Sequence, residues 1–430
     1  MGKKYWMLAG AFSVFSMQAQ EKPNVLLIMA DDMGYECLGA NGSTYKTPVL
    51  DQLAESAMLF KNCHSQPLST PSRVQLMTGK YNFRNYSHFA YLNPKERTFA
   101  HMAKEAGYVT CIAGKWQLGY DKRMPKVFGF DSCCLWQLTK QREEGERYAN
   151  VLYEQDGELM PRNIDTYGPD VFSDYIAEFI KKNKDKPFFA YYPMALIHDP
   201  FYPTPDSKEW SDSSLREKND TKLVADMVTY TDKLVGKLLD VLKKEGVYEN
   251  TVVIFLGDNG TNVKVFTPMK DGTVIQGGKK GTKRYGTHVP MIVSWPKMMK
   301  MKSVNENLVD FSDFYITLRD IMNGDQSKDQ DLDGISFYSQ LVGEKGKVRE
   351  WSFCHYQDQH KPDYVRFAQT VDYKLYLDGR FYNTRKDPLE KEELLKGSAS
   401  KEEELIRLKL KKVLDSYPVW GEGILTSVED

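Results

Sequence analysis

The sequence has no excess of either charge, because 58 Lys and Arg residues are offset by 59 Asp and Glu residues among 430. No basic field is available to hold nucleic acid, so a nucleic-acid partner is not expected. Histidine is scarce at seven residues, and the six cysteines contain no C-x-x-C pair, so nothing indicates a zinc site. We expect most of these cysteines to be free and buried.

Long apolar runs are also missing, so the sequence predicts no membrane span. Only the N-terminus differs: Lys3 and Lys4 precede an apolar run from Trp6 to Phe15, and small and polar residues follow. This layout is typical of a secretory signal peptide, with a buried N-terminal helix as the alternative. We therefore predict a leader over residues 1–20 and an exported protein, either periplasmic or secreted.

What is present fits a large globular protein. A chain of 430 residues with 41% hydrophobic residues exceeds one core of usual size, which favours a large domain plus a smaller one. Nearly continuous apolar runs alternate with helical patterns, and this predicts an α/β fold with a mostly parallel central sheet flanked by helices. The predicted strands are Val25–Met29, Tyr108–Ala113, Phe188–Tyr192, Thr251–Leu256 and Pro290–Ser294.

The pattern changes after about Trp351. Short alternating runs between residues 366 and 382 predict an antiparallel meander, and a charged terminal helix is expected over about 401–416, with Leu405, Leu408 and Val413 facing inward. We therefore predict a large α/β domain over residues 21–350 and a smaller C-terminal α+β subdomain, built on an antiparallel sheet, over residues 351–430.

Polar residues follow the predicted strands, where open α/β sheets place their sites. Asp31 and Asp32 end the first strand, and Asp258 and Asn259 end the fourth. Three crowded carboxylates repel each other unless a cation lies among them, and hard oxygen ligands suit calcium or magnesium. A turn or a helix cap is the alternative for one such pair, but a second pair after a separate buried strand favours a metal site.

Cationic side chains are expected at the same edge of the sheet. Lys115 follows the second strand, His198 follows the third, and Lys279 precedes the fifth. Alone, each of these residues would be read as an ordinary surface or core residue. Together they predict a pocket that holds a small tetrahedral anion beside a metal ion.

The segment Leu68–Lys80 is the most informative. Pro71 suits the first turn of a helix, which places Ser69 at a helix N-terminus where negative charge is favoured. An ordinary serine cap is the alternative. However, Ser69-Thr70-Pro71-Ser72-Arg73 followed by Thr78-Gly79 resembles the signature of the type I sulfatases, in the alkaline-phosphatase superfamily. Further blocks resemble that family in the same order: 24–32, 114–119, 187–200, 258–260 and 277–290.

This resemblance implies a sulfuric ester hydrolase in which residue 69 is oxidised to formylglycine, an aldehyde that hydrates to a geminal diol. It implies that one calcium ion is held by Asp31, Asp32, Asp258, Asn259 and modified Ser69, and that a diol oxygen attacks sulfur. His198 or Lys279 would protonate the leaving alcohol, and Arg73, Lys115 and Lys279 would hold the sulfate group. The second diol hydroxyl would then expel sulfate, which an ordinary serine cannot do.

The sequence departs from the family pattern in two places. The signature begins with serine rather than cysteine, which implies an anaerobic radical maturase as a partner during biogenesis and a bacterial source; an engineered Cys-to-Ser change would look the same. Gln117 stands where the family commonly has His, so it can orient the diol but cannot accept a proton. Lys279 and Lys280 both remain candidates for the sulfate-binding lysine.

Two other functions remain open. One is a phosphatase or phosphodiesterase of the same superfamily that uses unmodified Ser69 or Thr70. The other is a catalytically silent protein that binds sulfated glycans. We expect sulfated carbohydrate as the substrate, but the loops that would select the sugar carry no readable motif. Several residues could meet a sugar, although surface solvation is the expected role of each: Arg84, His88, Arg123, Arg142, Arg147, His288 and His355.

Overall fold

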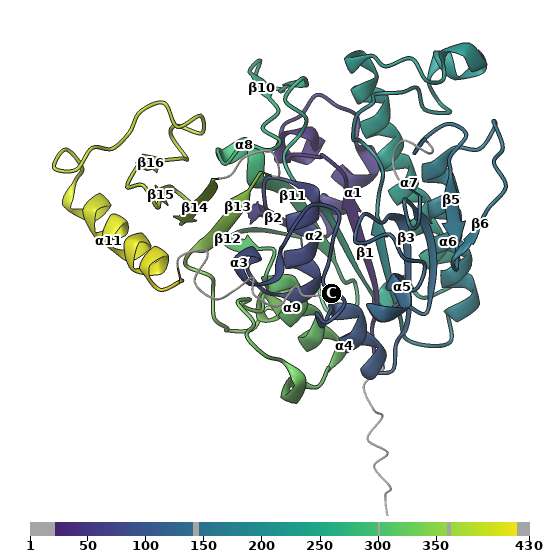
Figure 1. The fold of residues 1–430 in the computed structure, drawn as a ribbon, viewed down its shortest axis with the longest axis horizontal. Coiled ribbons are helices and arrows are strands. Elements are labelled where there is room, and N and C mark those ends of the chain that lie inside the picture. The colour runs from purple at the N-terminus through teal and green to yellow at the C-terminus, as the bar shows by residue number, and fades with distance from the viewer. Residues whose placement is uncertain (1–21, 141–145, 300–301, 359–362, 419–430) are drawn as a thin grey trace, which may run out of the picture.

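The computed structural model describes residues 22–140, 146–299, 302–358 and 363–418. The predicted leader, residues 1–20, lies outside them, and so does Arg142. The described chain has a large central sheet, a smaller sheet near the C-terminus (Figure 1) and a third sheet of only two strands.

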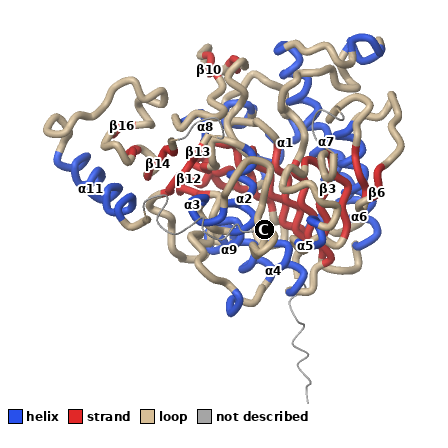
Figure 2. The backbone as a smooth tube through the Cα atoms, viewed as in Figure 1, coloured by secondary structure: helices blue, strands red, loops and turns tan. Residues whose placement is uncertain are grey.

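The central sheet is mixed but mostly parallel, which confirms the predicted fold class. Strands β8, β1, β7, β3 and β4 are parallel neighbours, whereas β11 runs antiparallel to β8 and β2. Figure 2 shows these strands in red at the centre of the molecule, with helices around them. In spatial order the strands are β12 (Ser303–Asp310), β2 (Met58–His64), β11 (His288–Ser294), β8 (Thr251–Gly257), β1 (Asn24–Ala30), β7 (Phe188–Pro193), β3 (Val109–Lys115), β4 (Ser132–Trp136), β5 (Tyr153–Gln155) and β6 (Glu158–Leu159).

Both faces of this sheet are covered, because successive side chains of a strand point to opposite faces. On β1, Leu26 and Ile28 pack into one core and Leu27 and Met29 into the other. The first core is closed by α1 (Pro48–Ser56), α6 (Gly168–Asn183) and α7 (Val224–Lys244). The second is closed by α2 (Ser69–Thr78), α4 (Phe99–Glu105) and α9 (Asp313–Met322).

The C-terminal sheet is antiparallel, as predicted, and has four strands: β13 (Ser352–Gln357), β14 (Tyr364–Gln369), β15 (Tyr373–Tyr376) and β16 (Phe381–Asn383). Helix α11 (Lys401–Asp415) packs on it through Leu410, Val413 and Leu414. The prediction that Leu405 and Leu408 face inward is wrong, since they are 67% and 55% exposed. The smaller elements are α3 (Asn82–Asn85), α5 (Met124–Val127), β9 (Phe266–Pro268), β10 (Val274–Gln276), α8 (Arg284–Thr287) and α10 (Tyr338–Leu341).

All six cysteines are free and buried, which confirms that expectation. Within the described residues, no helix combines the length and the apolar character that crossing a bilayer requires.

Candidate active site

Strands β1 and β8 bring the predicted metal ligands together at their carboxyl ends. The strands pair in parallel, with Ala30 opposite Gly257, so the residues that follow each strand are neighbours. The Asp32 backbone N–H donates to Asp258 Oδ1 at 2.8 Å, and Asn259 Nδ2 donates to Asp32 Oδ1 at 2.9 Å. All three side chains are buried. Asp32 takes a left-handed backbone conformation with a φ of 58°, which is uncommon outside glycine and turns the chain at the strand end.

Ser69 is the first residue of α2 and is buried against this cluster. Its Oγ lies 3.1 Å from Asp31 Oδ1 and 3.1 Å from Asn259 Oδ1, and it accepts a hydrogen bond from Lys115 Nζ at 3.1 Å. The hydroxyl therefore sits between anionic and cationic groups at a helix N-terminus, where developing negative charge is stabilised.

Two lysines form ion pairs with two of the three carboxylates. Lys115, at the end of β3, places Nζ 2.8 Å from both oxygens of Asp31. Lys279 Nζ lies 2.6 Å from Asp32 Oδ2, whereas the neighbouring Lys280 is exposed. Because β11 is antiparallel to β8, the segment before β11 reaches the same edge of the sheet that β1 and β8 reach at their ends.

Arg147 is a third cation, and the expectation that it is solvated at the surface is wrong. It is 2% exposed, its Nη1 lies 3.3 Å from Asp31 Oδ2, and its guanidinium carbon lies 4.3 Å from the centre of the Trp136 ring. The sequence signal was weak, because Arg147 lies in a segment without an apolar pattern. His288 and His355, which were expected at the surface as well, are also buried.

His198 lies at the border of the cluster, with Nε2 3.7 Å from Asp32 Oδ2. Its Nδ1 is 2.5 Å from the Asp199 carbonyl, which fixes the proton on Nδ1 and leaves the lone pair on Nε2. Burial, together with Arg147, Lys279 and Lys115, lowers the pKa of His198 well below its usual value, so the imidazole is neutral.

Arg73 and Gln117 contact the chain beside the cluster. The Arg73 guanidinium donates to the carbonyls of Lys115, at 3.0 Å, and Trp116, so it ties α2 to the end of β3. Gln117 Nε2 donates to Gln137 Oε1 at 2.5 Å. Gln137, a buried residue that follows β4, was not predicted from the sequence.

The electrostatics of the carboxylates call for added positive charge. Burial, with Asp31 and Asp32 close by, raises the pKa of Asp258 to about 8. Burial also raises the pKa of Asp32 despite Lys279, while Lys115, Arg147 and Lys279 outweigh burial and lower that of Asp31. A buried carboxylate with so high a pKa is poorly compensated by its neighbours, and a divalent cation relieves this strain.

The donor set fits such a cation. Ligand atoms of Asp31, Asp32 and His198 lie within 4.8 Å of one another and could hold a metal ion. Oxygens of Ser69, Asp258 and Asn259 adjoin the same two aspartates. Carboxylate, amide and hydroxyl oxygens favour a hard cation, whereas a soft metal would want thiolate.

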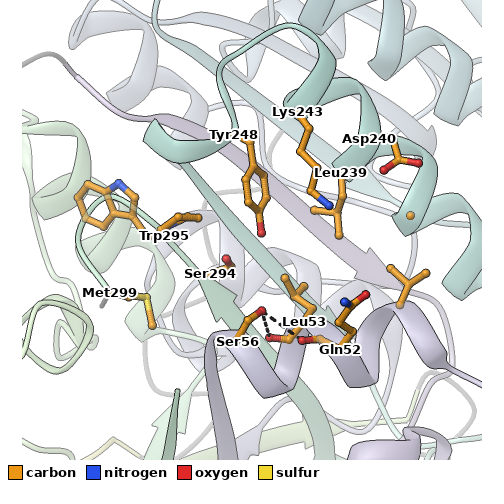
Figure 3. Close-up of a pocket in the computed structure, with 13 residues that line it drawn as sticks. Gln52, Leu53, Ser56, Leu239, Asp240, Lys243, Tyr248, Ser294, Trp295 and Met299 are labelled. Atoms are coloured by element: carbon orange, nitrogen blue, oxygen red, sulfur yellow. Dashed lines mark hydrogen bonds between the residues drawn. The ribbon is translucent and has the colours of Figure 1, made fainter. Parts of the chain in front are cut away.

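A small pocket opens beside this cluster. Its volume is about 290 Å³, and both charged and aromatic side chains line it: Trp136, Glu146, Arg147, Asp199, Pro200, Tyr202 and Asn219. A different pocket, of 610 Å³, is drawn in Figure 3 and includes Leu53, Tyr248, Ser294 and Trp295. Ser294 pairs with Val253 near the start of β8, so the pocket of Figure 3 lies at the opposite edge of the sheet.

Comparisons with known proteins agree with this geometry. The sulfatase family model matches residues 23–324, and a model described as N-sulphoglucosamine sulphohydrolase, C-terminal, matches residues 282–417. The N-acetylgalactosamine-6-sulfatase of Canis lupus familiaris is 29% identical over 83% of this chain and 72% of its own length.

Solved structures share the fold. Ps i-CgsB in complex with k-i-k-neocarrahexaose has a TM-score of 0.76 and 25% identity, and 92% of each chain is covered. The phosphonate monoester hydrolase of Agrobacterium radiobacter has a TM-score of 0.67 and 19% identity, and covers 92% of this chain and 95% of its own. Since different chemistries share this fold, the fold alone does not fix the reaction.

Proposed function

Since the chain belongs to the sulfatase family and is a sulfuric ester hydrolase, we propose that it removes sulfate from carbohydrates with a nucleophile made from Ser69. The observation that carries this proposal is the buried Ser69 hydroxyl, 3.1 Å from an acidic ligand candidate and 3.1 Å from the Lys115 ammonium. The carbohydrate substrate is supported by the names of the relatives and by the pocket that Tyr202 lines, since this partly exposed ring suits the apolar face of a sugar.

The metal proposed is calcium, held by Asp31, Asp32, Asp258 and Asn259 together with residue 69. When bound, this ion and a formylglycine at position 69 would supply a polarised aldehyde hydrate as the nucleophile. The chain's own cations have a separate task. Lys115 and Lys279, with the buried Arg73 beside them, attract the sulfate ester and stabilise the charge that builds on its oxygens.

The proton for the leaving alcohol is assigned to Lys279 rather than to His198. His198 is neutral and carries its proton on Nδ1, toward the Asp199 carbonyl, so its Nε2 accepts a proton and does not give one. Lys279 stays protonated, because Asp32 and Asp31 outweigh burial and raise its pKa. It is also 10% exposed at its side chain, so the departing proton can be replaced from solvent.

The test compares two preparations of the full chain, one carrying formylglycine at position 69 and one with plain serine, as read by peptide mass. We expect only the first to release sulfate from positionally defined sulfated sugars, and to contain one calcium ion per chain. High activity of the plain-serine protein on phosphate esters would favour the phosphatase alternative. Binding of sulfated sugars by the converted protein without release would favour the silent glycan-binding protein.

Export and maturation complete the proposal. Lys3, Lys4 and the apolar run that follows support a cleaved leader, and Ser69 supports conversion by a serine-type radical maturase of an anaerobic bacterium. The protein would then act in the periplasm or outside the cell. N-terminal sequencing of the exported protein tests the leader, which we expect to end near residue 20.

A further inference from the structure

Gln117 and Gln137 form a buried amide pair at the ends of two neighbouring strands. Strands β3 and β4 pair in parallel with Lys115 opposite Trp136, and each glutamine follows its strand. The two side chains meet through one hydrogen bond of 2.5 Å. They are only 7% and 3% exposed, and both residues have left-handed backbones, with φ of 48° and 60°. Such conformations are uncommon for glutamine and are often kept where function requires them.

The pair leaves two polar atoms without a partner. Gln117 Oε1 and Gln137 Nε2 are both buried and make no hydrogen bond to any described residue. Rotating both side-chain amides by half a turn exchanges the oxygen and nitrogen of each. The pair then still has one acceptor and one donor without a partner. Buried polar groups of this kind are costly unless a ligand or water binds them.

A second glutamine pair shows what a purely structural pair looks like. Gln66 Nε2 donates to Gln75 Oε1 at 2.7 Å, and both residues are buried. Here the outward atoms are used: Gln75 Nε2 donates to Asp310 at 2.7 Å, and Gln66 Oε1 accepts from the Cys354 thiol at 2.9 Å. The outward atoms of the Gln117–Gln137 pair, by contrast, have no partner among the described residues.

The backbone before each glutamine is anchored to the catalytic cluster. Lys115 contacts the Ser69 hydroxyl at 3.1 Å, and the Trp116 carbonyl accepts from Arg73, one turn further along the helix that begins at Ser69. On the other strand, the Trp136 ring stacks on Arg147, which contacts Asp31. The residues directly before the amide pair therefore contact the nucleophile site.

We propose that Gln137 is a positioning residue for Gln117, and that together they offer one donor and one acceptor to a hydroxyl of the hydrated residue 69. This inference rests on the proposed function. A hydroxyl both donates and accepts, so it satisfies both orphaned atoms, whereas a sulfate oxygen only accepts and leaves the acceptor unpaired. The two amides therefore bind a hydroxyl of the hydrate better than they would bind a sulfate oxygen in the same place. Neither amide titrates, so this preference does not depend on pH.

The substitution Gln137→Met tests the proposal, because it keeps the volume and removes both hydrogen-bonding atoms. In formylglycine-containing protein we expect kcat to fall about tenfold with KM nearly unchanged, since substrate binding does not use the pair. A second readout needs no turnover: an aminooxy probe forms an oxime with the aldehyde and releases water. Loss of hydrate stabilisation should speed labelling of the folded protein about tenfold, with labelling of the unfolded protein as the measure of aldehyde content.

A double-mutant cycle separates positioning from a general structural effect. In a Gln117→Ala background, Gln137→Met should cost nothing further, because Gln137 acts only through Gln117. Gln155→Met makes the same change on the adjacent strand β5 and should alter neither readout. Gln137→Asn, which is too short to reach Gln117, should behave like Gln137→Met and replaces it if that variant does not fold.

Equal losses from Gln137→Met with and without Gln117 would overturn the proposal, and so would unchanged labelling and kcat. The labelling readout remains valid if no sulfated sugar is turned over, so failure of the proposed function and failure of this inference are distinguishable.

Discussion

Two clusters of buried carboxylates lie in this molecule, and they are built in opposite ways. At the catalytic edge, Asp31, Asp32 and Asp258 adjoin one another, and the cations lie around them. At the junction with the C-terminal sheet, the carboxylates of Asp310 and Asp313 instead each have their own donors. Arg349 donates to both oxygens of Asp313, at 3.0 Å and 2.8 Å, and Asp310 Oδ1 accepts from Gln75, at 2.7 Å, and from Ser312.

The comparison shows that a raised pKa does not by itself mark a site. Burial raises the pKa of Asp310 to about 6 and that of Asp258 to about 8. What distinguishes the catalytic cluster is that further oxygens, from Ser69 and Asn259, are aimed into it and that a pocket opens beside it. The junction is closed by protein donors and is therefore structural.

The largest difference between the clusters should appear when one Asp in each is replaced by Asn. Asp258→Asn removes one anionic ligand of the proposed calcium site, so we expect calcium content to be lost and kcat to fall roughly a thousandfold or more. Metal analysis and sulfate release on formylglycine-containing protein measure both. The matched change at the junction, Asp310→Asn, should leave metal and kcat unchanged. A folded D258N protein with full metal content and activity would contradict the assignment.

At the junction the largest effect should be on stability. Arg349→Met leaves Asp313 buried without its charge partner, which costs about 3–5 kcal/mol of unfolding free energy. Denaturant unfolding measures this, while kcat per folded molecule should stay the same. Arg385→Met is the control, because its pair with Asp372 is exposed and should contribute less than about 1 kcal/mol.

The contrast between the clusters also explains what the sequence could predict. Asp31, Asp32, Asp258 and Asn259 follow long apolar strands directly, so parallel pairing was enough to bring them together. Arg147 and Gln137 reach the site from β4 and the loop that follows it, where no apolar pattern fixes their direction. Leu405 and Leu408 were misplaced for a related reason: α11 packs through only one narrow stripe, which the alternation of charges does not reveal.

A smaller effect is expected in how the free energy of unfolding depends on pH. The pKa of Asp310 is about 6 in the folded protein against a usual 3.8, so the folded state holds the proton more tightly. The contribution of Asp310 to stability is therefore full below pH 4 and is lost as pH rises to 6, by up to about 3 kcal/mol. Asp310→Asn keeps an oxygen for Gln75 and Ser312 and should make this fall shallower, which leaves the part that the raised pKa of Asp258 contributes. Unfolding curves at pH 4, 5, 6 and 7 measure it, and an unchanged slope in D310N would contradict it.

The smallest effect is expected for a substitution of Arg147, because two lysines also compensate the charge of Asp31. Among the described residues, Arg349 is the cation that pairs with Asp313. Arg147, by contrast, is one of three cations that act on Asp31, beside Lys115 and Lys279. Arg147→Met keeps the contact with the Trp136 ring but removes the charge, so kcat/KM should fall only about tenfold and the melting temperature should hardly change.

Arg147→Lys should restore part of the loss, since it returns the charge without the planar fork that stacks on Trp136. Arg162→Met is the matched control: Arg162 is exposed and donates to the Asn150 carbonyl, so kcat/KM should not change. If R147M instead lost several kcal/mol of stability at constant kcat/KM, Arg147 would resemble Arg349, and the catalytic edge would have two cations rather than three.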